Sequence, residues 1–108
     1  MTYAFTQDVP IGAAFYERIT DGLGPEVPAG LIVHVAVENP AGGLRYIDIW
    51  ESQEACDRFT DERLHPVVHD LLHKIFGDEL PDEPERVPLP IVHAWGAALR
   101  TIVGSAGL

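Results

Sequence analysis

The sequence predicts a single α+β domain in which four strands and two helices follow one another in the order β-α-β-β-α-β. Two observations carry this prediction. Side chains alternate over residues 31–38 and 44–51, and the glycine-rich turn between these runs indicates a hairpin. Apolar residues at helical spacing precede and follow the hairpin. Because 108 residues suffice for one modest core, we assign residues 1–108 to one domain.

The first strand and the first helix are expected before residue 25. Residues 1–8 alternate loosely and predict a short strand. Pro10 suits the first turn of a helix, and Gly24-Pro25 ends it. The stripe at helical spacing between them consists of Ile11, Phe15, Ile19 and Leu23.

The second helix follows the hairpin directly. Ser52 is a favourable N-cap, and Glu54 lies in the first turn, where the helix dipole favours an anion. The residue before a proline avoids the helical region, so His65-Pro66 predicts an interruption, after which the helix restarts and ends at Gly77. Residues 78–90 form an acidic, proline-rich connection, and residues 91–95 predict the fourth strand.

This element order is that of the ferredoxin-like, split βαβ arrangement, which places both helices on one face of a four-stranded antiparallel sheet. The other face is uncovered in a monomer. Because an open sheet face with apolar side chains usually finds a partner, the architecture predicts a homodimer.

Strand periodicity divides the side chains of the sheet into two sets. We expect the mainly aliphatic set to lie under the helices: Leu31, Val33, Val35, Val37, Ile47 and Ile49. We expect a polar and aromatic set to lie on the open face: His34, Tyr46, Asp48, Trp50, His93 and Trp95. Covered by a second subunit or by the long connection, the open face would become a small-molecule pocket.

The run from Tyr46 to Ala55, followed by Phe59 and Leu64-His65-Pro66, resembles the hairpin-to-helix segment of dimeric α/β-barrel proteins of the antibiotic biosynthesis monooxygenase (ABM) type. The resemblance implies a homodimer whose two sheets face each other and form a barrel. Trp50 matches an aromatic residue often found at this strand end. Phe59 stands where many relatives carry a histidine, and the Asn-Trp-His set of the haem-degrading branch is not recognisable.

The composition indicates which binding partners and which cellular compartment to expect. The formal net charge of -10 disfavours nucleic acid and anionic membranes, because phosphate binding needs clustered cations. No apolar stretch approaches the roughly 20 residues that span a bilayer, and the N-terminus resembles no secretory signal. A single cysteine, Cys56, fits a reducing cytoplasm, and its place beside Phe59 predicts a buried structural thiol.

The leading functional hypothesis is a cofactor-independent monooxygenase acting on a flat aromatic or polyketide-like substrate. The candidates are catalytic His34, His93, Asp48 and Tyr46, and substrate-binding Trp50 and Trp95. Either histidine would be the base, with Asp48 orienting it, Tyr46 donating a hydrogen bond and the tryptophans stacking on the substrate. A substrate carbanion that reacts with oxygen would need no protein-bound cofactor.

Two alternatives stay open. In the first, the protein is a non-catalytic dimerisation or ligand-sensing module, and its polar sheet residues only make interface hydrogen bonds. In the second, histidines bind haem or a metal, since His65, His69 and His73 recur every four residues on one helical face. No acidic residue completes a known zinc motif there, so we expect no metal.

Overall fold

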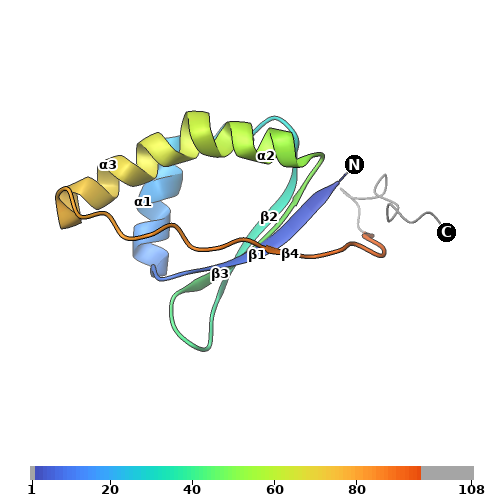
Figure 1. The fold of residues 1–108 in the computed structure, drawn as a ribbon, viewed down its shortest axis with the longest axis horizontal. Coiled ribbons are helices and arrows are strands. Elements are labelled where there is room, and N and C mark those ends of the chain that lie inside the picture. Colours follow the sequence, from blue (N-terminus) through green and yellow to red (C-terminus); the bar gives the residue numbers. More distant parts are fainter. Residues whose placement is uncertain (1, 96–108) are drawn as a thin grey trace.

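The structure, a computed structural model, describes residues 2–95 and consists of an antiparallel sheet with helices on one side (Figure 1). The elements in chain order are β1 (Tyr3–Val9), α1 (Ala13–Leu23), β2 (Leu31–Glu38), β3 (Leu44–Trp50), α2 (Gln53–Phe59), the π-helical segment η1 (Thr60–Leu64), α3 (His65–Phe76) and β4 (Val87–Pro88). The predicted α+β class and element order are confirmed.

The four strands lie in the order β2-β3-β1-β4, and every neighbouring pair is antiparallel. This order is compatible with the ferredoxin-like arrangement. The predicted hairpin of β2 and β3 is confirmed, and its turn passes close to the end of β1. At Gly43 the backbone has φ +72°, and a Cβ atom there would lie 2.3 Å from the carbonyl oxygen of Val9. Only glycine satisfies both conditions.

The second helix begins as predicted but is not broken at His65-Pro66. The Ser52 hydroxyl oxygen accepts a hydrogen bond from the Ala55 amide at 3.1 Å. His65 keeps helical dihedral angles, and its amide donates to the carbonyl of Thr60, five residues earlier. Proline in an α-helix clashes with the carbonyl four residues before it, and the wider π-helical turn relieves this clash. The expected interruption is therefore a π-helical segment, not a break.

The fourth strand lies earlier in the chain than predicted. Val87–Pro88 pairs with Phe5 and Thr6 of β1, and the Leu89 amide extends the pairing to the Ala4 carbonyl at 2.9 Å. The prediction of a strand over residues 91–95 is wrong, because that segment pairs with no strand of the described chain. Residues 78–90 were predicted to be a loop because they contain several prolines. An edge strand nevertheless tolerates a proline where the missing N–H would face solvent.

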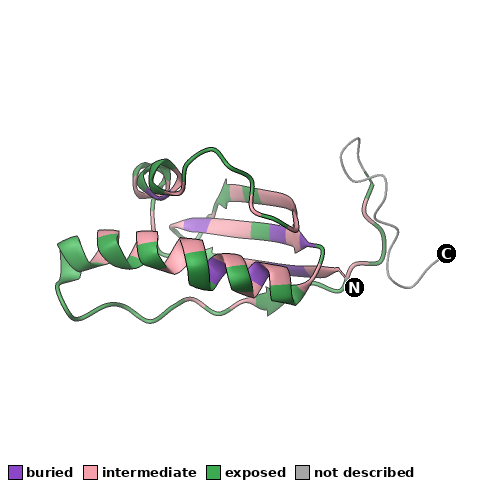
Figure 2. Cartoon of the chain, turned by 90° about the horizontal axis from the view of Figure 1, so that it is seen from above, coloured by how far each residue is buried: buried purple, intermediate pink, exposed green. Residues whose placement is uncertain are grey.

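The alternation in β2 and β3 is as predicted, but the two sets of side chains face the opposite way. Trp50 and Asp48 are 2% and 7% exposed on the side of the helices, where Trp50 packs against Phe59, whereas Val35 and Ile47 are 42% and 37% exposed on the outer face. Figure 2 shows buried segments in the sheet and in the helix that lies over it. The expectation that the polar set lies on the open face is therefore wrong. Of the set expected under the helices, only Leu31 lies there, since a β-bulge shifts the register between Leu31 and Val33.

The physical reason lies in the size of the side chains. The Trp50 ring lies 5.6 Å from the Phe59 ring of α2 and forms, with Phe5 and Cys56, the buried centre of the molecule. Large aromatic groups fill the space between sheet and helices, where burial stabilises them most. The β-branched residues then form an apolar area on the outer face, beside the Asp8–Arg45 ion pair. No helix of the described chain covers this face (Figure 1).

Candidate functional site

A cavity of about 190 Å³ lies between the sheet and the helices. It contains four of the six predicted site residues: His34, Tyr46, Asp48 and Trp50. They come from neighbouring positions on β2 and β3, where His34 pairs directly with Asp48. The sequence therefore grouped these four side chains correctly, although it placed them on the wrong side of the sheet.

Asp48 is the centre of the polar contacts in this cavity. One of its carboxylate oxygens, Oδ1, lies 2.5 Å from Nδ1 of His34. The other, Oδ2, accepts a hydrogen bond of 3.0 Å from the Trp50 indole. A carboxylate facing Nδ1 favours the tautomer that carries its proton on that nitrogen. Nε2 of His34 is then left as a proton acceptor.

Tyr16 of α1 completes this arrangement, and the sequence analysis missed it. Its hydroxyl lies 2.7 Å from Nε2 of His34, and the two rings are stacked. Burial, and then the charge of Asp48, raise the pKa of the Tyr16 hydroxyl, which therefore stays protonated and donates to His34. The helical spacing of Tyr16 with Ile19 and Leu23 places it on the buried face of α1, and this spacing was the available signal.

Tyr46 lies beside the chain of Asp48, His34 and Tyr16. Its ring centre is 5.0 Å from that of His34 and 5.6 Å from that of Tyr16. Burial is the main cause that raises the pKa of the Tyr46 hydroxyl. Near neutral pH this hydroxyl is a neutral hydrogen-bond donor at the wall of the cavity, as its sequence-predicted role requires.

The remaining wall is largely apolar. Its main aromatic and aliphatic members are Phe5, Leu31, Trp50 and Phe59. Cys56 also lines it, and burial raises the pKa of this thiol from 9.0 to about 11. The prediction of a buried Cys56 is confirmed. A thiol with such a pKa is a poor nucleophile near neutral pH.

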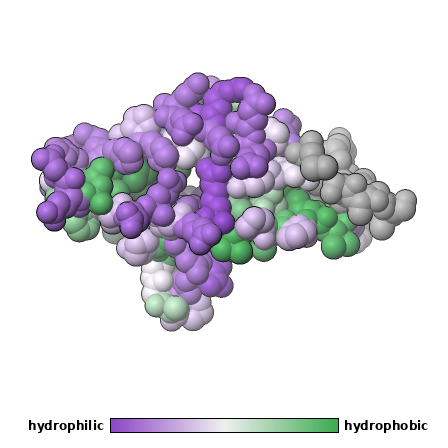
Figure 3. Space-filling model, in the orientation of Figure 1, coloured by the Kyte–Doolittle hydropathy of each residue, from purple (hydrophilic) through white to green (hydrophobic). Residues whose placement is uncertain are grey.

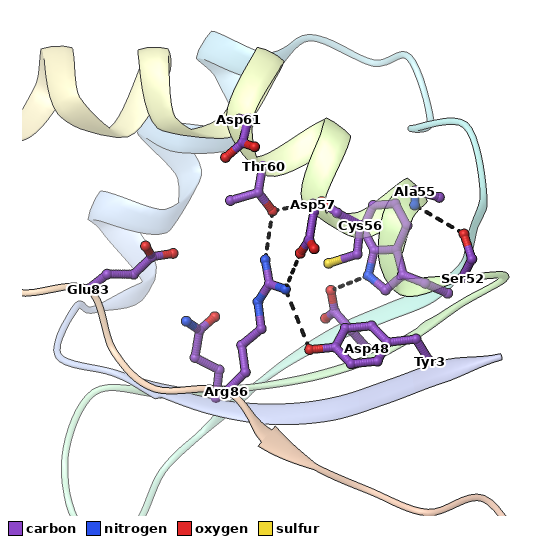
Figure 4. Close-up of polar contacts among 12 residues, drawn as sticks. Tyr3, Asp48, Ser52, Ala55, Cys56, Asp57, Thr60, Asp61, Glu83 and Arg86 are labelled. Atoms are coloured by element: carbon purple, nitrogen blue, oxygen red, sulfur yellow. Dashed lines mark hydrogen bonds and ion pairs between the residues drawn. The ribbon is translucent and has the colours of Figure 1, made fainter. Parts of the chain in front are cut away.

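Arg86 lines the cavity from the segment that connects α3 to β4, which we call the strap (residues 78–86). Its guanidinium group donates to Asp57 at 2.7 Å and to the Thr60 hydroxyl at 3.0 Å (Figure 4). Burial opposes the charge of Arg86, but hydrogen bonds to Tyr3 and Asp57 outweigh this effect and raise its pKa. Arg86 thus ties the strap to the second helix. The sequence analysis did not identify this residue, because nothing in the acidic strap indicated its partners.

His93 and Trp95 lie away from the cavity. They follow β4, their rings are 6.3 Å apart, and Trp95 is 86% exposed. The prediction that they share one sheet face with His34 is wrong, because it depended on a strand over residues 91–95. Neither residue lines the cavity in the described structure.

The histidines of α3 form an exposed edge beside the strap. The rings of His65 and His69 stack at 5.1 Å, and Nε2 of His65 lies 3.2 Å from the carboxylate of Glu83. His73 contacts the carbonyl of Gly77 at the end of the helix. Among residues 2–95, no three His, Cys, Asp or Glu side chains are grouped so that they could hold a metal ion.

No protein-family model matches the sequence, and no curated protein matches it. Within residues 2–95, no helix has the length and apolar character needed to cross a membrane.

Proposed function

We propose that this protein binds a small, flat, mostly apolar phenol or enol in the cavity between sheet and helices and oxidises it with molecular oxygen, without a protein-bound cofactor. The observation that carries this proposal is the hydrogen-bonded chain of Asp48, His34 and Tyr16 in a mostly apolar cavity. A buried carboxylate, an oriented imidazole and a polar group at hydrogen-bond distance form a general-base arrangement.

In this proposal the Tyr16 hydroxyl contacts the substrate directly. A substrate hydroxyl gives its proton to the Tyr16 oxygen while Tyr16 passes its own proton to Nε2 of His34. Asp48 stabilises the resulting imidazolium through Nδ1, and Trp50 holds the carboxylate in place. The transfer from Tyr16 to His34 runs along a contact of 2.7 Å, which is short enough for a hydrogen bond.

The oxidation balances with a quinol and oxygen alone. The deprotonated ring forms a carbon–oxygen bond with dioxygen, and the oxygen–oxygen bond then breaks. One oxygen atom stays in a hydroxyquinone and the other leaves as water, so the substrate supplies all four electrons. The cavity volume of about 190 Å³ lies below the roughly 300–1,000 Å³ typical of sites for drug-sized ligands. We therefore propose substrates with one or two rings.

We also propose that the protein is a homodimer in which the outer sheet faces meet, as in the ABM-type barrel that the sequence resembles. Val35, Val37, Ile47, Val87 and Leu89 are each more than a third exposed. A monomer that exposes this many aliphatic side chains on one sheet gains stability when a second apolar surface covers them.

Oxygen uptake with a panel of quinols tests the proposed reaction. We expect His34→Ala and Tyr16→Phe to lower the rate by about 10²–10⁴-fold, the usual contribution of a general acid or base. His93→Ala is the matched control, since it removes an exposed imidazole outside the cavity and should retain the wild-type rate. Label from ¹⁸O₂ should appear in the hydroxyquinone and in water.

Two results would contradict the proposal. Equal rates for wild type and His34→Ala would remove His34 as the base. Hydrogen peroxide formed in place of a labelled hydroxyquinone would indicate an oxidase, because no oxygen atom would then enter the product.

A further inference from the structure

A second cavity, of about 150 Å³, lies between α1, α3 and the strap. Its apolar lining comes from all three elements and includes Phe15, Val68, Leu72 and Leu80. Figure 3 shows hydrophobic surface recessed among hydrophilic residues in the region where Figure 1 places α3 and the strap. We call this space the outer cavity and the space that contains His34 the inner cavity.

The two cavities share a wall. Ile19, Tyr46 and Leu64 line both of them, together with Gln7 and Glu83 at the strap side. The Tyr46 ring, which lines both cavities, lies 5.0 Å from the His34 ring and 5.6 Å from the Tyr16 ring. The two cavities therefore adjoin at Tyr46, and this adjacency is the geometric basis of the proposal that follows.

The outer cavity is more than a packing gap at a helix contact. α3 has an apolar face towards α1 and the strap, yet none of its residues is fully buried. The outer cavity is partly open to solvent, so its apolar side chains meet water on that side and lack protein contacts there. An apolar ligand group would supply those contacts.

We propose that the ligand has two parts: a ring in the inner cavity and an unbranched alkyl or acyl arm in the outer cavity. The assignment of the ligand's ring to the inner cavity rests on the proposed function. Because a water-sized group takes about 30 Å³, the outer cavity accommodates an arm of about five carbon atoms. Asp82 and Glu83 at its wall and the net charge of -10 exclude an arm that ends in a carboxylate.

The test uses 1,4-hydroquinone and its 2-alkyl derivatives from methyl to octyl. Their dissociation constants are measured by isothermal titration calorimetry under anaerobic conditions, so that binding is separated from turnover. We expect affinity to rise about two- to fourfold with each methylene group, the gain from burying it, and to level off near five carbons.

Variants of α3 locate the arm. Leu72→Trp fills the outer cavity and should abolish the dependence on chain length while the affinity for hydroquinone itself stays unchanged. Leu72→Ala enlarges the cavity and should move the plateau to longer chains. Ile75→Trp is the control, since Ile75 is on the same helix but is 54% exposed and lines neither cavity.

The results also separate this inference from the proposed reaction. An affinity that does not depend on chain length, an unchanged dependence in Leu72→Trp, or no binding by the whole series overturns the two-part site. Chain-dependent binding without oxygen uptake supports the two-part site and contradicts the proposed oxidation. Oxygen uptake with quinols whose affinity does not depend on alkyl-chain length supports the proposed oxidation and contradicts the two-part site.

Discussion

At the scale of single residues, the contacts of Asp48 explain why a carboxylate can be buried under the helices without a large loss of folding stability. Its two oxygens face His34 and the Trp50 indole, so both have polar partners although the residue is only 7% exposed. A buried carboxylate without such partners would be strongly destabilising. The same contacts that satisfy Asp48 orient the imidazole of His34.

Cys56 gives a prediction about chemical reactivity. With a pKa of about 11 the native thiol is ionised about 100-fold less at pH 8 than an ordinary thiol with a pKa of 9.0. We expect alkylation by iodoacetamide at pH 8 to be at least about 100-fold slower in the native protein than in urea. Equal rates in both conditions would contradict the burial of this thiol.

The same shift predicts how stability depends on pH. The folded state holds the thiol proton more tightly than the unfolded state, so this contribution to stability is complete below pH 9 and is lost as the pH rises towards about 11. The free energy of unfolding, measured by urea denaturation, should fall over this range. The fall should be smaller in Cys56→Ala, and an identical fall in both proteins would show that Cys56 makes no contribution.

At the scale of elements, the strap depends on a few side-chain contacts, because β4 pairs over only two residues. Arg86 makes the main contact, and its guanidinium also lies 5.1 Å above the Phe5 ring. We expect Arg86→Met to lower the free energy of unfolding by about 1.5–3 kcal/mol, the range for hydrogen bonds to charged groups. Hydrogen exchange of the Leu89 amide, which donates to the Ala4 carbonyl at 2.9 Å, should become faster.

Arg58→Met is the control for this prediction. Arg58 also pairs with a carboxylate at 2.7 Å, but both partners are largely exposed on α2. Such a surface pair contributes about 0.5 kcal/mol or less. A similar loss of stability in both variants, or an unchanged exchange rate of the Leu89 amide in Arg86→Met, would contradict the role of Arg86.

The elements themselves were largely predictable from the sequence, because periodicity, Ser52 and the glycine turn are local signals. The strand β4 was not predictable, since two paired residues among prolines leave no periodic pattern. The π-helical segment was not predictable either. The rule that the residue before a proline avoids the helical region applies to an α-helix, and His65-Pro66 lies at a π-helical turn. Tyr16 was hidden for a different reason: its partner His34 is 18 residues away, and only the folded chain brings them together.

At the scale of the whole molecule, alternation could not tell which face of the sheet the helices cover. A period of two sorts Val35 from His34 but carries no information on which of them meets a helix. The assumption that polar groups stay on the open face fails here, since the site lies inside and the outer face is apolar. That arrangement is expected if the outer face is itself a buried surface in an assembly.

The proposed homodimer is tested by placing a charge on the outer face. We expect wild type to sediment as a dimer and Val35→Asp to sediment as a monomer, because an unpaired carboxylate in an apolar interface is strongly unfavourable. Ile75→Asp is the control, since Ile75 is similarly exposed but lies on α3. A monomeric wild type, or a dimeric Val35→Asp, would contradict this mode of assembly.

The central claim is that ligand chemistry takes place at His34, under the helices, and not on the open face or beside His93. The most direct measurement is a ¹⁵N NMR spectrum of the histidine side chains, recorded anaerobically with and without hydroquinone. We expect His34 of the ligand-free protein to carry its proton on Nδ1, and its Nε2 resonance to move when hydroquinone is added, while the resonances of His93 stay unchanged. A ligand response at His93 with an unchanged His34 would contradict it.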